Sequence, residues 1–240
     1  MTKLFIQMAG FRIVMEANYD YVRHQCAPYL KEFPLEDADF YVSASPKEVA
    51  KEISVGEKDG LRVSEGYAES ICLYRALCTR LPEKDAMLMH AAVISDGQYA
   101  YAFTAPSGTG KSTHIRLWRQ AFGEDIFVIN GDKPILRLMD GVWWVYGTPW
   151  CGKEGWQTNI GMPLTAICLL SRGEENRITD LSPTDAVLGL MHQILLSKSP
   201  DMARAQMQLL NSLVTKVPLY ALSCSVSEEA AHVARAAMTP

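Results

Sequence analysis

The chain has 240 residues, a net charge of -4, 48% hydrophobic residues and 21% charged residues, which is typical of a globular protein with one large domain or one domain plus an appendage. The acidic balance argues against a general nucleic-acid binder, because phosphate backbones demand clustered positive charge, and no apolar run is long enough to cross a bilayer. Six scattered cysteines without a CxxC pair, and an N-terminus without a signal-peptide pattern, lead us to expect reduced thiols and a cytoplasmic location.

The first 64 residues are expected to form a β-rich segment, because short apolar runs alternate with glycine, proline and acidic positions. Strands are predicted at 4–8, 11–15 and 40–43. We find no catalytic constellation in this segment and interpret it as a surface for packing or homo-oligomer formation. A helix is predicted over 66–81, before Pro82. The expected division is therefore 1–80 as the β-rich N-terminal segment plus this helix, and 81–240 as the main domain.

Two apolar runs, 87–94 and 99–103, are predicted to be strands. The four residues between them contain Asp96-Gly97, and Asp-Gly is a strong hairpin signal. We therefore expect these two strands to pair antiparallel.

The rest of the chain alternates between predicted strands and helices, which indicates an α/β fold. Strands are predicted at 126–129, 134–138, 142–146, 164–170 and 219–222, and helices at 111–122, 183–197, 201–215 and from 227. Residues 147–156 (Gly-Thr-Pro-Trp-Cys-Gly-Lys-Glu-Gly-Trp) contain too many glycines for a regular element and are predicted to be a loop, here named the Trp-rich loop.

Residues 105–112 (Ala-Pro-Ser-Gly-Thr-Gly-Lys-Ser) fit the phosphate-binding loop pattern, with alanine in place of its first glycine. The two glycines permit backbone conformations in which successive N–H groups turn toward an anion. Lys111 would add a charge for the β- and γ-phosphates, and Ser112 a hydroxyl for Mg²⁺. The residues expected to bind the nucleotide are Ser107, Gly108, Thr109, Gly110, Lys111, Ser112 and Thr113.

Asp132 follows the short buried strand at 126–129, and ligands of open α/β sheets sit at strand ends beside such a loop. We predict that Asp132 binds Mg²⁺ or accepts a proton from the acceptor, with loop capping as the alternative. His90 lies in the strand predicted to pair with the one that leads into the loop, so a role at the phosphates and a core role stay open. Lys153 and Glu154 are either acceptor-binding residues or solvated loop charges.

Other polar and aromatic residues are less informative. Arg137 and Arg204 carry charges suited to phosphate, but nothing in the sequence selects either. His114 is expected to pack on its helix. Four tryptophans lie between 143 and 156, and these either stack on a base or acceptor or pack in the core.

The order of these features resembles the HPr kinase family: a histidine in a strand, an antiparallel hairpin, the run APSGTGKST, and a short strand ending in Asn-Gly-Asp about twenty residues later. The same arrangement is similar to the nucleotide domain of phosphoenolpyruvate carboxykinases. The GTPW run and residues 163–178 look similar to small HPr-kinase-like proteins, some linked to peptide-modification systems. The resemblance covers roughly 86–225. It implies a mixed-sheet P-loop domain in which Lys111 and Ser112 bind phosphates and metal, Asp132 is the catalytic or metal-binding aspartate and His90 lies near the phosphates.

The chain also departs from that family. HPr kinases carry two adjacent aspartates where this chain has Gly131-Asp132, and they favour glutamate where it has Thr113. Nothing clearly matches the segment that they use for the reverse, phosphatase reaction, so we do not expect HPr itself to be the substrate.

Together these features lead us to expect an ATP- and Mg²⁺-dependent kinase that transfers the γ-phosphate to a hydroxyl of a peptide, protein or small metabolite. The alternative is a nucleotide-binding regulatory module without phosphotransfer. A carboxykinase is a weaker third option, because the chain is too short for that architecture and paired metal ligands are not found.

Overall fold

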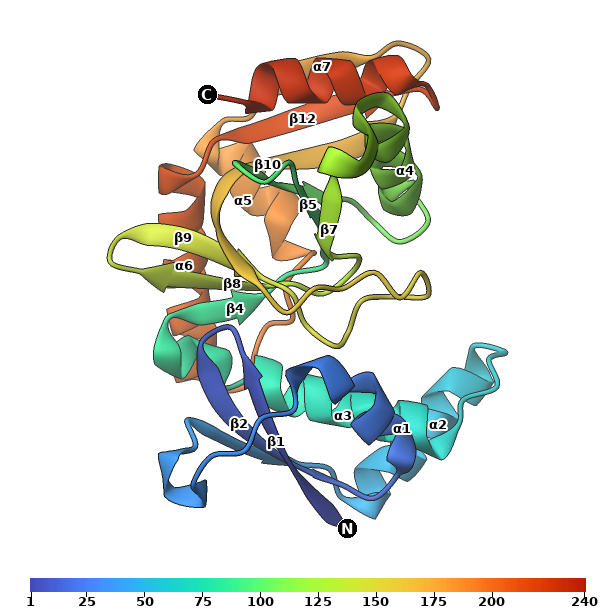
Figure 1. Cartoon of the computed structure of the whole chain (residues 1–240), viewed down its shortest axis with the longest axis vertical. Coiled ribbons are helices and arrows are strands. Elements are labelled where there is room, and N and C mark those ends of the chain that lie inside the picture. The colour runs from blue at the N-terminus through green and yellow to red at the C-terminus, as the bar shows by residue number, and fades with distance from the viewer.

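Two β-sheets organise the chain, which the computed structural model describes over residues 1–240 (Figure 1). The small sheet has the order β1-β2-β3, formed by Thr2–Met8, Phe11–Ala17 and Phe40–Ser43. β1 and β2 form a hairpin because Ala9 and Gly10 adopt the positive φ values of a tight turn, 53° and 73°. β3 then joins β2 in parallel.

The N-terminal segment contains more helix than its sequence led us to expect. Three helices pack with the small sheet: α1 (Asp20–Gln25), α2 (Pro46–Lys58) and α3 (Glu65–Cys78). α1 and α2 fall inside the stretch expected to be β-rich. α2 forms there because Ser45 and Glu48 make a reciprocal capping box around its first turn, which satisfies backbone N–H groups that a helix end otherwise leaves unpaired.

The large sheet has nine strands, seven of them in the order β4-β8-β9-β10-β6-β5-β7, while β12 pairs with β10 and β11 with β12. In chain order the strands are β4 (Ala86–Leu88), β5 (Ala91–Ser95), β6 (Ala100–Thr104), β7 (Phe127–Asn130), β8 (Ile135–Met139), β9 (Val142–Tyr146), β10 (Gly161–Arg172), β11 (Arg177–Asp180) and β12 (Leu219–Cys224). β10 joins the two halves of the sheet, because its first residues pair antiparallel with β9 and its later residues pair in parallel with β6 and β12. The sheet is therefore mixed.

Helices cover both faces of the large sheet. They are α4 (Lys111–Phe122), α5 (Pro183–Met191), α6 (Pro200–Lys216) and α7 (Glu228–Met238). Alternate residues of β5 point to opposite faces: Ala92 and Ile94 pack in a cluster with α4 and α7, whereas Ala91 and Val93 pack in a cluster with α5 and α6. Because both faces are buried, β5 and β6 consist almost wholly of apolar residues.

The predicted hairpin is confirmed, and two other predictions are wrong. β5 pairs antiparallel with β6, and β8 with β9. The single strand expected over 87–94 is instead broken at Met89 and His90, because β4 pairs with β8 while β5 pairs with β6 and β7. The helix expected over 183–197 ends at Met191. The extended chain beyond it is held by the Gln206 side chain, which accepts from the N–H of Ser197 and donates to the carbonyl of Leu195.

One apolar cluster joins the small sheet to the large sheet. The apolar cluster of the N-terminal segment also includes Ile135 of β8 and Trp150 of the Trp-rich loop.

No helix is both long and apolar enough for a membrane span. All six cysteines are free thiols.

Candidate functional site

The segment from β6 into α4 carries the residues that fit the phosphate-binding pattern, and we name it the phosphate-binding-type loop. Gly108 and Gly110 have φ values of +78° and +130°, which glycine adopts far more readily than other residues. Gly110 is the N-cap of α4, so the N-terminal N–H groups of this helix face the loop. Lys111 is buried, and its Nζ donates to the carbonyl of Ala105 at 2.9 Å, which folds the side chain back over the loop. Burial lowers the pKa of Lys111, and the Asp132 carboxylate opposes that shift.

A buried amide at the end of β7 sets the position of Asp132. Asn130 is fully buried, and its Oδ1 accepts from the backbone N–H groups of Asp132 at 2.9 Å and Lys133 at 2.7 Å. The Asn130 Nδ2 donates to the carbonyl of Thr148 at 2.9 Å. The Thr148 hydroxyl in turn donates to the carbonyl of Lys133 at 2.7 Å. The first residues of the Trp-rich loop therefore brace the turn that carries Asp132.

Both oxygens of the Asp132 carboxylate are engaged. Oδ1 lies 3.1 Å from Nε2 of His90, and Oδ2 lies 2.7 Å from Nζ of Lys133. Burial by itself raises the pKa of Asp132, but the hydrogen bond from His90 and the charge of Lys133 outweigh it, so the pKa lies below its usual value. Asp132 is therefore an anion at neutral pH.

His90 lies at the bend between β4 and β5 and not within a strand, which corrects the expected placement. Its backbone N–H donates to the carbonyl of Gln193, and its Nδ1 lies 3.1 Å from Oε1 of the same residue. Thr104, at the end of β6, donates its hydroxyl to the carbonyl of His90 at 2.8 Å. Because Asp132 accepts at Nε2 and Gln193 contacts Nδ1, the ring is held at both nitrogens.

One cavity of about 540 Å³ collects these groups, and we name it the phosphate cavity. The predicted residues that line it are His90, Ser107, Gly108, Gly110, Lys111, Ser112, Thr113, Asp132, Lys153 and Glu154. Thr109 does not line it and instead faces an adjoining cavity of about 430 Å³.

Lys153 and Glu154 are neighbours in the chain but play different structural roles. Glu154 forms an ion pair with Arg116 of α4 at 2.7 Å, and the Arg116 guanidinium lies 5.4 Å from the ring centroid of Trp156. The Trp-rich loop is thus tied to the helix that follows the phosphate-binding-type loop. Lys153 is exposed and has no hydrogen-bond or ion-pair partner, so its charge is free to meet a ligand.

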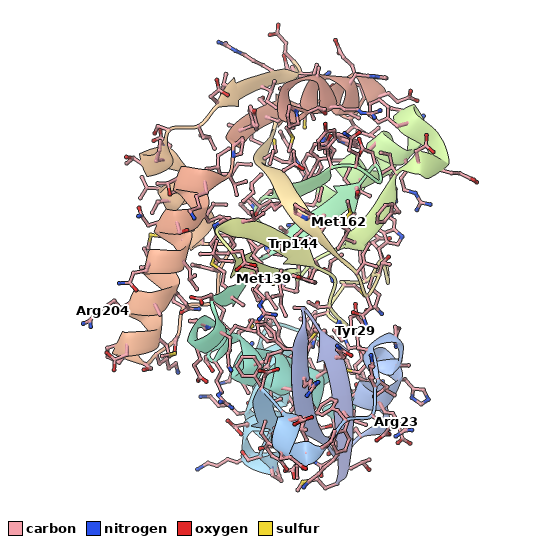
Figure 2. All side chains as sticks on the ribbon, turned by 60° about the vertical axis from the view of Figure 1, so that its left-hand side comes forward. Arg23, Tyr29, Met139, Trp144, Met162 and Arg204 are labelled. Atoms are coloured by element: carbon pink, nitrogen blue, oxygen red, sulfur yellow. The ribbon has the colours of Figure 1, made fainter.

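Arg137 and Arg204, between which the sequence did not select a phosphate-binding residue, lie outside both cavities. Arg204 projects outward from α6 (Figure 2) and is 74% exposed. Arg137 lies over the ring of Phe11 and donates to the carbonyl of Ala9 at 2.8 Å, which ties β8 to the small sheet. His114 is buried, and its Nε2 accepts from Nε1 of Trp118, as a packing role on α4 requires.

Sequence reasoning missed four residues that build this site: Asn130, Lys133, Thr148 and Gln193. The spacing Asn-x-Asp carried a readable signal for the first, because an asparagine side chain often accepts from the backbone two residues ahead. Lys133 stands directly beside Asp132 in the sequence. Gln193 carried no signal, because its contact with His90 spans 103 positions.

The oxygen donors in the phosphate cavity suit Mg²⁺, which prefers hard oxygen ligands and takes several of them from nucleotide phosphates. The Ser112 hydroxyl and the Asp132 carboxylate are the donors that could hold it. No group of three or more His, Cys, Asp or Glu side chains gathers anywhere in the chain, so an all-protein metal cage is absent.

No family model matches the chain, and no curated protein matches it. Among solved structures, the HPr(Ser) kinase/phosphatase from Coxiella burnetii is similar with a TM-score of 0.37 and 11% sequence identity, over 64% of this chain and 99% of that one. A TM-score this low supports no statement about site residues or activity, for which this chain's own geometry is the basis.

Proposed function

We propose that this protein is an ATP- and Mg²⁺-dependent kinase that transfers the γ-phosphate to a hydroxyl. The observation that carries the proposal is that Lys111 and the paired Asp132 and His90 line one cavity. Phosphoryl transfer asks a protein chiefly to hold phosphates, neutralise charge and orient the acceptor, and these residue types supply those functions.

Each residue has a role that follows from its position. The N–H groups at the start of α4 and the Lys111 ammonium bind the phosphate oxygens. Ser112 and Asp132 would hold Mg²⁺, which when bound neutralises charge on the phosphates. Asp132 accepts the proton of the acceptor hydroxyl at its carboxylate, and His90 fixes the direction of that carboxylate through the 3.1 Å contact.

The adjoining cavity of about 430 Å³ offers room for the base and ribose, because it shares Gly108, Gly110 and Thr113 with the phosphate cavity. Arg172 donates to the carbonyls of Gly108 at 2.6 Å and Thr109 at 3.2 Å. This contact holds the loop between the two cavities in place.

Two variants, Lys111→Ala and Asp132→Asn, test the proposal. Lys58→Met is the control, because it removes a positive charge at the C-terminal end of α2, outside the phosphate cavity. We expect Lys111→Ala to weaken binding of a fluorescent ATP analogue at least tenfold, because a charge-assisted contact contributes about 1.5–3 kcal/mol. Asp132→Asn should keep nucleotide affinity within a few-fold and reduce turnover about 100-fold, because it keeps the shape but removes the charge. Unchanged nucleotide affinity in a folded Lys111→Ala protein would overturn the proposal.

The ion pair between Lys133 and Asp132 favours a second candidate, a nucleotide-binding module without phosphotransfer, because it leaves the carboxylate neutralised by its neighbour. Such a module would bind ATP tightly and show no turnover with any acceptor, in the parent and in Asp132→Asn alike. A kinase would show turnover that Asp132→Asn removes.

A further inference from the structure

A second cavity, of about 520 Å³, lies between α1, α3 and the Trp-rich loop, and we name it the α1–α3 cavity. It shares five lining residues with the phosphate cavity: Tyr67, Asp132, Cys151, Gly152 and Lys153. Asp132 therefore faces both cavities. A molecule in the α1–α3 cavity can reach this carboxylate without entering the space around the phosphate-binding-type loop.

Buried and half-buried hydrogen bonds join the walls of the α1–α3 cavity. Trp150 of the Trp-rich loop donates from Nε1 to the carbonyl of Ser70 at 3.2 Å and to its hydroxyl at 3.0 Å. The Ser70 hydroxyl donates to Oε1 of Gln25 on α1, and Nε2 of Gln25 donates to the carbonyl of Pro149 at 3.2 Å. These contacts close a circuit through α1, α3 and the loop, so the cavity is preformed and needs little ordering when a ligand binds.

Aromatic side chains form much of the wall. Tyr21 and Tyr67 are an edge-to-face pair with ring centroids 6.2 Å apart, and they remain 43% and 46% exposed. Deeper in the cavity, the ring centroids of Tyr74 and Trp150 lie 5.5 Å apart. The close approach of α3 to α1 depends on Gly66, because a Cβ there would lie 2.6 Å from the Cβ of Tyr21. The wall suits a flat or apolar ligand body.

The charges of the lining favour an anion. Lys153 and His24 have no hydrogen-bond or ion-pair partner, and Asp132, the single carboxylate of the lining, is already paired with Lys133. In addition, the Gln157 side-chain oxygen is buried without a donor, so a hydroxyl or amine of a ligand would satisfy it. A carboxylate on the ligand would meet the free ammonium of Lys153 and a ring N–H of His24, while its hydroxyl meets Asp132.

We propose that the α1–α3 cavity binds the phosphate acceptor, and that this acceptor is a small hydroxy carboxylic acid with an aromatic or apolar body. The assignment rests on the proposed kinase function. In the reaction the hydroxyl oxygen forms a bond to the γ-phosphorus, the bond from that phosphorus to the β–γ bridging oxygen breaks, ADP leaves, and the hydroxyl proton passes to Asp132. A volume of about 520 Å³ holds a small molecule and not a folded protein.

Ligand-observed NMR with a panel of aromatic and aliphatic hydroxy acids, 3-phenyllactate among them, tests the assignment against the matched neutral diols. Ile71→Trp places a larger side chain in the cavity wall, and Lys153→Met removes the free charge. Lys58→Met, which lies outside the cavity, is the control.

We expect the hydroxy acid that binds best to bind at least tenfold tighter than its diol. Ile71→Trp should weaken it at least tenfold and change affinity for the ATP analogue less than threefold. Lys153→Met should remove most of the preference for the acid over the diol.

Mass detection of a phosphate ester after incubation with ATP and Mg²⁺ completes the test. The proposal fails if no acid of the panel binds, if diols bind equally well, if the acids bind a folded Ile71→Trp protein with parental affinity, or if a bound acid is never phosphorylated while ATP binds. Should Ile71→Trp not fold, Lys153→Met and His24→Ala still report on the preference for the acid. Absence of ATP binding would instead overturn the kinase function, and the NMR measurement without nucleotide would still show whether the cavity takes an anion.

Discussion

The buried side-chain amide of Asn130 positions Asp132 through both of its polar atoms. Its oxygen accepts from the backbone N–H of Asp132, and its nitrogen donates to the carbonyl of Thr148. The next residue, Gly131, has no room for a side chain, because a Cβ there would lie 2.7 Å from the carbonyl oxygen of Cys151. This crowding explains why the chain has a glycine at position 131, beside Asp132. A single carboxylate therefore serves this strand end.

We expect Thr148→Val to destabilise the fold by about 2–4 kcal/mol, because it leaves the carbonyl of Lys133 and the N–H of Trp150 without their hydroxyl partner in a fully buried position. Thr148→Ser keeps the hydroxyl and should cost about 1 kcal/mol. Urea unfolding of the two variants measures the difference. Equal stabilities would show that the hydroxyl does not support the turn that carries Asp132.

His90→Ala is expected to lower turnover at least tenfold while it lowers the melting temperature by only a few degrees, because the ring is partly exposed and contacts the Asp132 carboxylate. Gln193→Leu should give a smaller loss of the same kind, since it removes the contact to Nδ1. Steady-state kinetics and thermal unfolding are measured on the same samples. A stability loss in proportion to the activity loss would assign His90 a core role.

At the scale of elements, α4 connects the phosphate-binding-type loop to the core. Its inner face carries His114, Ile115 and Trp118, which pack against β5 and β6. The Nδ1 of His114 is buried without a partner, and burial lowers the pKa of this histidine to about 4. Protonation at Nε2 would also break the hydrogen bond from Trp118.

The lowered pKa of His114 makes stability depend on pH. The contribution of neutral His114 to the free energy of unfolding is fully present above pH 6.5, the ordinary pKa of histidine. This contribution is lost as the pH falls toward about 4, the pKa of His114 in the folded protein, because the unfolded chain binds the proton first. The loss is on the order of 3 kcal/mol. His114→Gln should remove most of this dependence, which chemical denaturation at pH 7, 6, 5 and 4 measures. An equally steep loss in the variant would place the titration elsewhere.

At the scale of the whole molecule, the N-terminal segment and the large sheet share buried residues, as Ile135 and Trp150 show. The division near residue 80 is therefore a boundary in the sequence that side chains cross in space, and the assignment of 1–80 and 81–240 as two parts stays a prediction.

We expect the molecule to unfold in one transition. Ile13→Ala, in the core of the small sheet, should cost about 2–5 kcal/mol and shift the midpoint by the same amount in circular dichroism and in tryptophan fluorescence. All five tryptophans lie between 118 and 156, and only Trp150 among them belongs to the apolar cluster of the N-terminal segment, so fluorescence reports chiefly on the other part of the chain. Lys58→Met is the surface control. A shift in circular dichroism alone would show two independent domains.

The sequence by itself determined the local features of this protein. Asp96-Gly97 indicated a hairpin through its turn chemistry, the run from Ala105 to Ser112 indicated a loop with glycines at positive φ, and apolar runs indicated buried strands. Asp132 could be named as a candidate because it follows one of these strands. That Lys111, Ser112 and Asp132 hold phosphate and metal stays a prediction.

Only the tertiary structure decided which distant segments meet. The bend at His90 exists because two different strands pair with the two halves of one apolar run, a choice that local propensity does not contain. The contact from Gln193 to His90 and the closure of the α1–α3 cavity by Gln25 and Ser70 likewise join residues far apart in the chain. Backbone conformation and burial are encoded within a few residues, whereas the partner of each buried polar group depends on how all the elements pack together.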